Sequence, residues 1–528
     1  MRLTQRSVRS KVAVAMMTLA IPLSAYAEGL PKPTASIPDQ RALHILNRIA
    51  YGPRPGDIER VKVLGIDRYI DQQLNPERIP ESPDLEHRLR DLATLRMSTV
   101  ELFNRYEPHP ILGRRPSTEE AKAIREESRI VLRQAVEARL LRAVDSERRL
   151  QEVMTDFWFN HFNIFSGKGL DRIWVGAFEQ QAIRPNALGR FRDLLGATAK
   201  HPAMLFYLDN WQNTAPNTPG ARGKEQGLNE NYAREIMELH TLGVEGGYSQ
   251  DDVIALARIF TGWGLPEGLR LTQGRGDGFY FDSRRHDTGT KLFLGHTIRS
   301  AGIAEGEQAM DILARSPVTA RHLSFELAQY FVADQPDPAL VDALTKRYLE
   351  TDGNIREVLR TLLTSPQFWD PTSYSRKFKT PYEYVVSSVR AAGIAVTAVR
   401  PLEGQLNQLG MPLYGYQTPD GYKNTRDAWL NSDAMSRRLN FATALGAGRT
   451  RIGERAANDD TRLEPGQNTP PLLGFAMAAD NMPQPLDANR LMATLARQFS
   501  PKTLQSVASA APPLKASLIL GSPEFMNR

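Results

Sequence analysis

The 528-residue sequence contains no cysteine. Disulfide bonds, thiolate metal sites and cysteine nucleophiles are therefore excluded. The fold must be held together by its hydrophobic core, and a chain of this length can build a large one. Hydrophobic residues make up 41% of the chain and charged residues 24%, which is typical of a soluble globular protein.

Long apolar runs and the common catalytic motifs are also missing. After the first 27 residues, no stretch approaches 18 uninterrupted apolar residues, so we expect no transmembrane anchor. The sequence has no G-x-S-x-G nucleophile elbow, no P-loop and no HExxH metal-binding helix. It therefore identifies no reaction, no cofactor and no metal.

The first 27 residues have the pattern of a secretory signal peptide. Basic residues precede the apolar segment at 12–23, and Ala25-Tyr26-Ala27 has the form of a cleavage site. The basic region holds no consecutive arginines, which favours the general secretory route over the twin-arginine route. We expect an exported protein, periplasmic or extracellular. The competing interpretation is an ordinary amphipathic N-terminal segment.

The positive charge of the whole chain comes mostly from this leader. The formal net charge is +6, from 66 basic and 60 acidic residues. Removing the four basic residues of the leader leaves 62 basic residues against 60, a net charge of +2. This near-neutral balance gives no support to nucleic-acid binding.

Helical patterns dominate residues 28–528, which we predict to form a single large domain of a mainly α class. Ser117 and Glu120 form a capping box before a helix that runs to about Asp145. Residues 270–300 alternate around Gly and Asp turns, which predicts one small β-hairpin. Polar, Gly/Pro-containing segments predict mobile loops near 104–117, 213–227 and 447–472.

Two predicted helices each direct one histidine toward the core. His161 lies on the apolar stripe of a helix at 147–163, and His240 lies on the apolar side of NENYAREIMELHTLG at 229–243. If these helices face each other, the two imidazoles meet. The commoner alternative is a core histidine bonded to a carbonyl or a carboxylate. Glu235 points about 140° away from His240 around the helix, so the two are not expected to hold one ion.

A third candidate position is the pair His286-Asp287, followed by Lys291, in the predicted β segment. Such a pair can supply nitrogen and oxygen ligands. A turn-forming role is the favoured interpretation, because a dipeptide is a weak signal and Asp is common in turns.

Several longer blocks resemble one family in the same order along nearly the whole mature chain. They include FWFNHFNIF at 157–165, NENYAREIMELHTLGVEGGYSQDDV at 229–253, HDTGTKLFLG at 286–295 and MPLYGYQTPDGYKNTRDAWLNSDAMSRRLNFA at 411–442. The chain is similar to the bacterial "domain of unknown function 1800" family. The resemblance implies an exported, mainly helical protein without an agreed biochemical activity.

The resemblance also implies a partner and a set of candidate site residues. The family is often encoded beside proteins resembling alkaline phosphatases and sulfatases, which makes such a protein the expected partner. The blocks carry over two groups of candidates. The catalytic candidates are His161, Glu235, His240, His286 and Asp287. The substrate-binding candidates are Asn160, Asn229, Asn231 and Lys291.

Two functions compete on these observations. The first, weakly favoured because no motif defines a mechanism, is a binding or accessory protein that works with the phosphatase- or sulfatase-like partner in the cell envelope. The second is an exported hydrolase-like enzyme with a His/Asn/Glu cleft, metal-dependent or not, in which histidine is a general base or a metal ligand. In the second, the 213–227 loop would act as a lid. The two are separated by whether the polar residues converge on one pocket.

Overall fold

The computed structural model describes residues 37–108, 115–220, 227–266, 277–453, 484–496 and 499–528. Within these ranges the chain forms 24 α-helices and two small antiparallel sheets, which confirms the predicted mainly α fold with a small β element. None of the helices in these ranges is long and apolar enough to cross a membrane. The predicted signal peptide lies outside the described residues, as do large parts of the three predicted loops.

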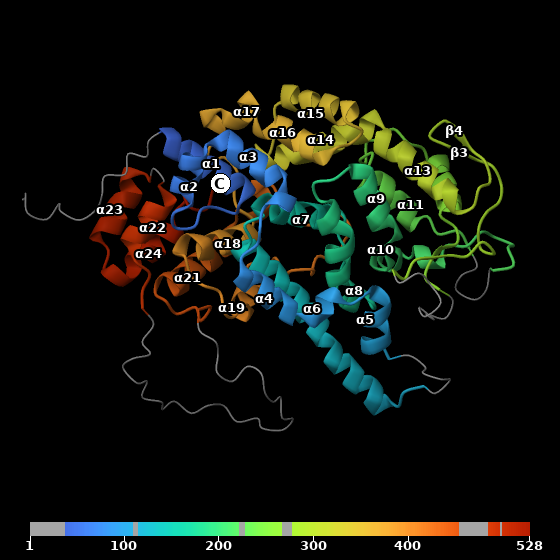
Figure 1. Ribbon diagram of the computed structural model, residues 1–528, viewed down its shortest axis with the longest axis horizontal. Coiled ribbons are helices and arrows are strands. Elements are labelled where there is room, and N and C mark those ends of the chain that lie inside the picture. The colour runs from blue at the N-terminus through green and yellow to red at the C-terminus, as the bar shows by residue number, and fades with distance from the viewer. Residues whose placement is uncertain (1–36, 109–114, 221–226, 267–276, 454–483, 497–498) are drawn as a thin grey trace, which may run out of the picture.

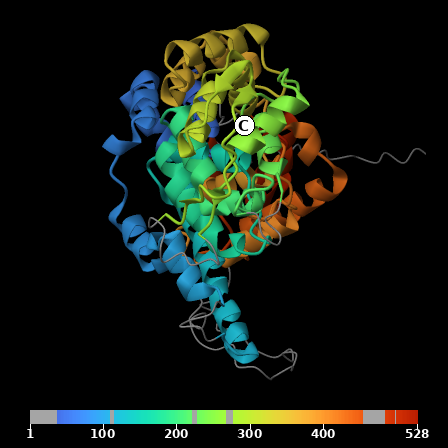
Figure 2. The ribbon, with the colours of Figure 1, turned by 90° about the vertical axis from the view of Figure 1, so that its right-hand side faces the viewer.

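The N-terminal part of the described chain contributes six helices. The longest, α6, begins at the predicted capping box: Ser117 Oγ accepts the Glu120 N–H at 3.2 Å, and the Glu120 carboxylate accepts the Ser117 N–H at 2.7 Å. Its first turns are exposed and project from the body of the protein (Figures 1 and 2). The six are α1 (Ile37–Ile49), α2 (Asp57–Leu64), α3 (Ile66–Leu74), α4 (Pro83–Asp91), α5 (Thr99–Tyr106) and α6 (Thr118–Asp145). Helix α5 ends at Tyr106, within the range near 104–117 in which the first loop was predicted.

Helix α7 lies in the middle of the molecule, where α1, α3 and α6 contact it (Figure 1). Ten of its 13 residues are buried, including the polar residues Glu152 and His161. A helix buried on all sides cannot turn its polar residues to water, so each needs a partner inside the protein. The central helices are α7 (Arg149–His161), α8 (Asp171–Phe178), α9 (Phe191–Lys200), α10 (Pro202–Tyr207), α11 (Asn231–Glu238) and α12 (Gln250–Ile259).

The β structure consists of two short pairs. Strands β3 (Lys291–Phe293) and β4 (His296–Ile298) form the predicted hairpin. Its turn residues Leu294 and Gly295 both have positive φ, as the tightest hairpins require. Strand β1 (Trp263–Gly264) pairs with β2 (Tyr280–Phe281), a sheet that the sequence pattern did not indicate.

The remaining helices form two groups. The first holds α13 (Ile303–Arg315), α14 (Pro317–Phe331), α15 (Pro338–Glu350), α16 (Ile355–Leu363), α17 (Pro366–Trp369) and α18 (Pro381–Ala392). The second holds α19 (Arg400–Gln408), α20 (Arg426–Trp429), α21 (Ser432–Gly446), α22 (Ala488–Leu495), α23 (Pro501–Ser509) and α24 (Pro512–Leu520). In Figure 1, α14–α16 lie side by side, and α22–α24 occupy the end opposite the β3–β4 hairpin. Buried apolar residues from α1 to α24 form one continuous cluster.

Two helical glycines give a matched test of how tightly this core is packed. A Cβ on Gly306 in α13 would lie 2.2 Å from the Trp263 ring, whereas no described atom lies within 4 Å of a Cβ on Gly404 in α19. We expect Gly306→Ala to lower the free energy of unfolding by about 1–3 kcal/mol through overpacking. Gly404→Ala should raise it by up to about 1 kcal/mol through helix propensity. Urea unfolding followed by circular dichroism measures both, and shifts of the same sign would contradict the packing of α13 on Trp263.

Candidate functional site

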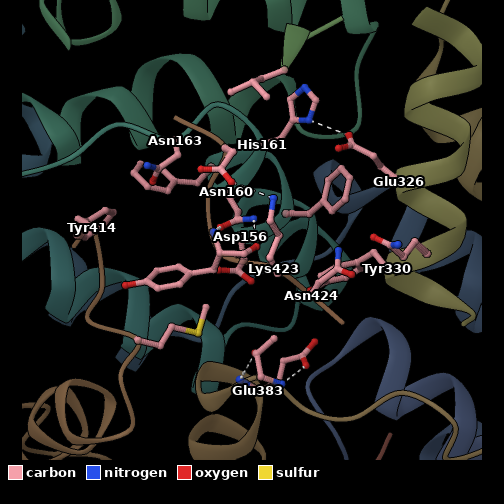
Figure 3. Close-up of a pocket in the computed structure, with 18 of the residues that line it drawn as sticks. Asp156, Asn160, His161, Asn163, Glu326, Tyr330, Glu383, Tyr414, Lys423 and Asn424 are labelled. Atoms are coloured by element: carbon pink, nitrogen blue, oxygen red, sulfur yellow. Dashed lines mark hydrogen bonds and ion pairs between the residues drawn. The ribbon is translucent and has the colours of Figure 1, made fainter. Parts of the chain in front are cut away.

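A cavity of about 270 Å³ opens between α7, α14 and residues 411–424, a segment that we call the aromatic loop. Figure 3 shows the labelled side chains that line it. Helix α7 supplies Asp156, Asn160 and His161, and α14 supplies Glu326 and Tyr330. The cavity therefore joins segments that are far apart in the sequence, which is the usual construction of a ligand site.

His161 ends α7 and is held from two sides. Its Nδ1 lies 2.9 Å from Glu326 Oε2, and its Nε2 lies 3.2 Å from the backbone carbonyl oxygen of His240. Both ring nitrogens thus face oxygen atoms of the protein. His161 and Glu326 are therefore paired on the cavity wall.

Glu326 lines the cavity with 30% of its side chain exposed, while its Oε2 atom, beside His161, is buried. Loss of water contact works to raise its pKa, but the charge of His161 and the hydrogen bond from it outweigh this and hold the pKa below the ordinary value. One turn earlier in α14, His322 places Nε2 at 3.6 Å from Glu326 Oε1. The carboxylate thus lies between two imidazoles.

His240 lies behind His161 rather than on the cavity wall. The two ring centroids are 6.0 Å apart, so the two predicted histidines do meet. The His240 ring is fully buried, and burial, with a smaller effect from His161, places its pKa well below the ordinary value. The imidazole of His240 is therefore neutral, and the backbone carbonyl of this residue orients His161.

Two asparagines, Asn160 on α7 and Asn163 just after it, attach the aromatic loop. Asn160 Nδ2 donates to the Tyr422 carbonyl at 2.8 Å, and Asn160 Oδ1 accepts the Tyr422 N–H at 2.7 Å. Asn163 Nδ2 donates to the Thr418 carbonyl at 2.8 Å. Gly421 fits because a Cβ there would lie 2.2 Å from the Asn160 carbonyl oxygen. The Asn160 amide is thus engaged with the loop on both of its polar atoms, and it acts as a positioning residue.

The floor of the cavity is a buried charge network. Arg139 from α6 forms ion pairs with Asp156 and, at 3.2 Å, with Glu179 of the π-helical turn η3 (Glu179–Ile183). The hydroxyl of Tyr414 donates to the same Glu179 at 2.9 Å. Burial would raise the pKa of Glu179, but the charges of Arg139 and Arg184 keep it below the ordinary value. The floor is therefore rigid and electrically balanced.

Two polar atoms of residues on the cavity wall have neither a hydrogen-bond partner nor an ion-pair partner in the described part of the chain. They are the hydroxyl of Tyr330, on α14, and Oδ1 of Asn424, at the end of the aromatic loop. Buried polar atoms are normally satisfied, so unmatched atoms beside a cavity indicate that a ligand or solvent completes them.

Asn229, Asn231 and Glu235 lie around the start of α11 and do not line this cavity. The N–H of Asn229 is accepted by Asn213 Oδ1 at 2.9 Å, and the Asn229 amide donates to the Asp209 carbonyl at 3.1 Å. Asn231 donates to a carbonyl of the same turn, that of Leu208, at 3.2 Å. The two asparagines thus anchor the start of α11. Burial, followed by the like charge of Glu238, raises the pKa of Glu235.

His286, Asp287 and Lys291 form a separate cluster around Glu305 of α13. His286 Nε2 lies 2.9 Å from Glu305 Oε1, and Lys291 Nζ donates to Glu305 Oε2 at 2.6 Å. Asp287 pairs with Arg258 at 2.8 and 3.1 Å. These groups satisfy one another and none lines the cavity, so the cluster ties β3 to α13 and α12. In the described ranges, no group of three or more His, Asp or Glu residues is arranged to hold a metal ion.

Of the nine candidates, the structure thus places Asn160 and His161 on the cavity wall and His240 directly behind it. Sequence reasoning missed the residues from α14 and from the end of the aromatic loop, namely His322, Glu326, Tyr330 and Asn424. The spacing of His322 and Glu326 puts them on one helix face, which was the available signal. Nothing in that spacing shows that this face meets His161.

The Glu305 cluster generates a stability prediction. Burial works to raise the pKa of Glu305, but hydrogen bonds from His286 and Lys291 outweigh it and hold the pKa below 4.5. Glu305→Gln should lower the free energy of unfolding by about 3–5 kcal/mol at neutral pH, because it leaves the buried Lys291 without its counter-charge. A lowered folded-state pKa means that the carboxylate stabilises the fold above pH 4.5, and that this contribution disappears as the pH falls through the folded-state value. The difference between variant and wild type should therefore shrink in acid.

Urea midpoints across a pH series measure this difference. The matched control is Lys346→Gln on α15, where Lys346 is 78% exposed and lies 3.8 Å from Glu350. It should cost less than about 1 kcal/mol. Equal effects of the two substitutions at neutral pH would contradict a structural role for the Glu305 cluster.

Comparison with known proteins places the whole arrangement in one family. A family model described as "Protein of unknown function (DUF1800)" matches residues 44–527, which include α7, α14 and the aromatic loop. No curated protein and no solved structure matches the chain. Since the match covers most of the sequence, as the motif blocks at 157–165, 229–253 and 411–442 indicated, the chain belongs to the DUF1800 family.

Proposed function

We propose that this protein is an exported ligand-binding protein whose cavity beside His161 takes a small polar molecule. The observation that carries the proposal is the pair of unmatched polar atoms, the Tyr330 hydroxyl and Asn424 Oδ1, on the wall of a cavity of about 270 Å³. Sites for drug-sized ligands span ~300–1,000 Å³. A cavity at the lower edge of that range suits a small ligand.

Binding is supported over catalysis by the way the polar residues are engaged. Both nitrogens of His161 face protein acceptors, and both polar atoms of the Asn160 amide bind the aromatic loop. A general base needs a free lone pair directed at the substrate. His161 and Asn160 instead shape and hold the cavity.

A hydrolase is the second candidate, and Glu326 is the observation that favours it. Its carboxylate is ionised, partly exposed and placed between His161 and His322. A carboxylate in this position can accept a proton from water or from a substrate hydroxyl. Glu326→Gln separates the two functions, because it would abolish any turnover of a bound ester or glycoside while the unhydrolysed compound still binds.

Export and partnership complete the proposal. The basic and apolar leader with Ala25-Tyr26-Ala27 supports secretion and cleavage before Glu28. The family resemblance supports a phosphatase- or sulfatase-like partner in the cell envelope. On this proposal the protein presents its ligand to that enzyme, or retains it there.

Ligand binding can be tested with a variant that blocks the cavity. We expect that at least one compound from a panel of hexoses, amino acids, nucleosides and dicarboxylates raises the melting temperature of the wild-type protein. A ligand at 100 times its Kd stabilises the folded state by about 2.7 kcal/mol. Leu413→Trp, which fills the cavity from the aromatic loop, should abolish the shift. Leu292→Trp, at a 65% exposed leucine on β3, should retain it. A shift that survives Leu413→Trp would place the ligand elsewhere.

Export and partnership have their own measurement. In cells that produce the full chain, intact-mass analysis of the envelope fraction should find a protein beginning at Glu28. Affinity purification of this form should recover a phosphatase- or sulfatase-like protein from the same cells. A purified form that retains Met1 in the cytoplasm would remove the export proposal, and recovery without the partner would remove the accessory role.

A further inference from the structure

The carboxylates deep in the cavity wall each lie against at least one basic partner. Arg139 is shared between Asp156 and the buried Glu179, and Glu326 lies 2.9 Å from His161. The remaining deep pair is Glu383–Arg528, at 2.8 Å, with both side chains 3% exposed.

The carboxylates at the mouth of the cavity are also paired with basic side chains. Asp420 lies 2.9 Å from Lys423 on the aromatic loop, and Glu238 lies 3.5 Å from Arg234 at the end of α11. All five carboxylates that line the cavity are thus paired. A charged ligand would lose its hydration without gaining an unpaired counter-charge, which is a costly exchange.

The groups that remain to interact with a ligand are buried polar atoms without a partner at the cavity wall, and aromatic rings. The Tyr330 hydroxyl can donate and Asn424 Oδ1 can accept, and the Glu326 carboxylate offers a further acceptor. Phe157 and Tyr330 meet edge to face, with ring centroids 5.2 Å apart, beside these atoms. A sugar ring has hydroxyl groups at its edge and an apolar C–H face, so a site that combines hydrogen-bonding groups with aromatic rings suits it.

Resting on the proposed binding function, we infer that the cavity takes a neutral polyhydroxylated ligand, such as a single pyranose sugar. Tyr330 and Asn424 form hydrogen bonds with hydroxyl groups of the ligand. Glu326 accepts a hydrogen bond from a further hydroxyl group, and the rings of Phe157 and Tyr330 cover the apolar face of the ligand. Burial keeps the pKa of Tyr330 well above its ordinary value, so this residue stays a neutral donor.

The experiment uses a matched set of ligands on the full mature protein. A panel of glucose, galactose and mannose first identifies the neutral hexose that binds best by isothermal titration calorimetry. The uronate and the protonated amino sugar of the same stereochemistry then test charge at constant ring shape. We expect the neutral hexose to bind at least about tenfold more tightly than either, which corresponds to about 1.4 kcal/mol.

Two substitutions test whether paired charges cause this preference. Glu326→Gln removes the negative partner of His161 and should shift the preference toward the uronate. His161→Gln leaves Glu326 with only the more distant His322, at 3.6 Å, and should shift the preference toward the amino sugar. Opposite shifts from two neighbours cannot result from a general loss of structure. If either variant fails to fold, Asp420→Asn and Lys423→Gln repeat the test, with smaller shifts in the same directions, at a pair in which Lys423 is 62% exposed.

The outcomes separate this inference from the function on which it rests. A wild-type protein that binds the uronate or the amino sugar as tightly as the hexose overturns the neutral-ligand inference and leaves a binding protein. So does a panel in which amino acids or nucleosides bind through the cavity and no neutral sugar does. If no compound of any class binds, both the inference and the proposed function fail.

Discussion

The arrangement of the site depends on satisfying one buried imidazole. His161 ends a helix that is enclosed on all sides, so its two nitrogens must find partners inside the protein. One partner, Glu326, comes from α14, and the other, a backbone carbonyl, follows α11. These two contacts fix how far α14 and the end of α11 approach α7. The cavity occupies the space that the aromatic loop leaves between them, where Asn160 holds the loop.

A chain without cysteine relies on buried polar clusters to fix the relative positions of its helices, and this protein has two kinds. The cluster around Glu305 is closed, because His286 and Lys291 occupy both of its oxygens and none of these residues lines the cavity beside His161. The cluster around Glu326 is open, because its carboxylate is partly exposed and the Tyr330 hydroxyl near it has no partner among the described residues. A closed cluster can only stabilise and orient the fold. An open one retains hydrogen-bonding capacity for a ligand, so the functional argument rests on it although both contain a histidine and a glutamate.

Local signals in the sequence predicted the elements well and the site only in part. Capping residues located the start of α6, and turn residues located the β3–β4 hairpin, because both depend on contacts within a few positions. The apolar positions of His161 and His240 showed that both rings enter the core, where they meet. Which face of which distant helix covers them is a tertiary property, and periodicity within α14 cannot report it. The amides at 229–231 illustrate the opposite error, since short polar residues at a helix start satisfy local backbone groups as readily as they bind a substrate.

The charged pairs of the cavity wall act differently according to how deeply they are buried. The Arg139–Asp156 pair on the floor has side chains only 8% and 13% exposed, whereas Lys423 at the mouth is 62% exposed. Salt screens exposed charges over about 8 Å at physiological ionic strength but reaches buried pairs far less. Charges at the mouth therefore act mainly on the rate of encounter, and the buried pairs act on the affinity of the bound ligand. In the exported setting that we propose, ionic strength varies. Because the buried pairs set the preference for neutral over charged ligands, this preference stays the same while the rate of ligand association changes with salt.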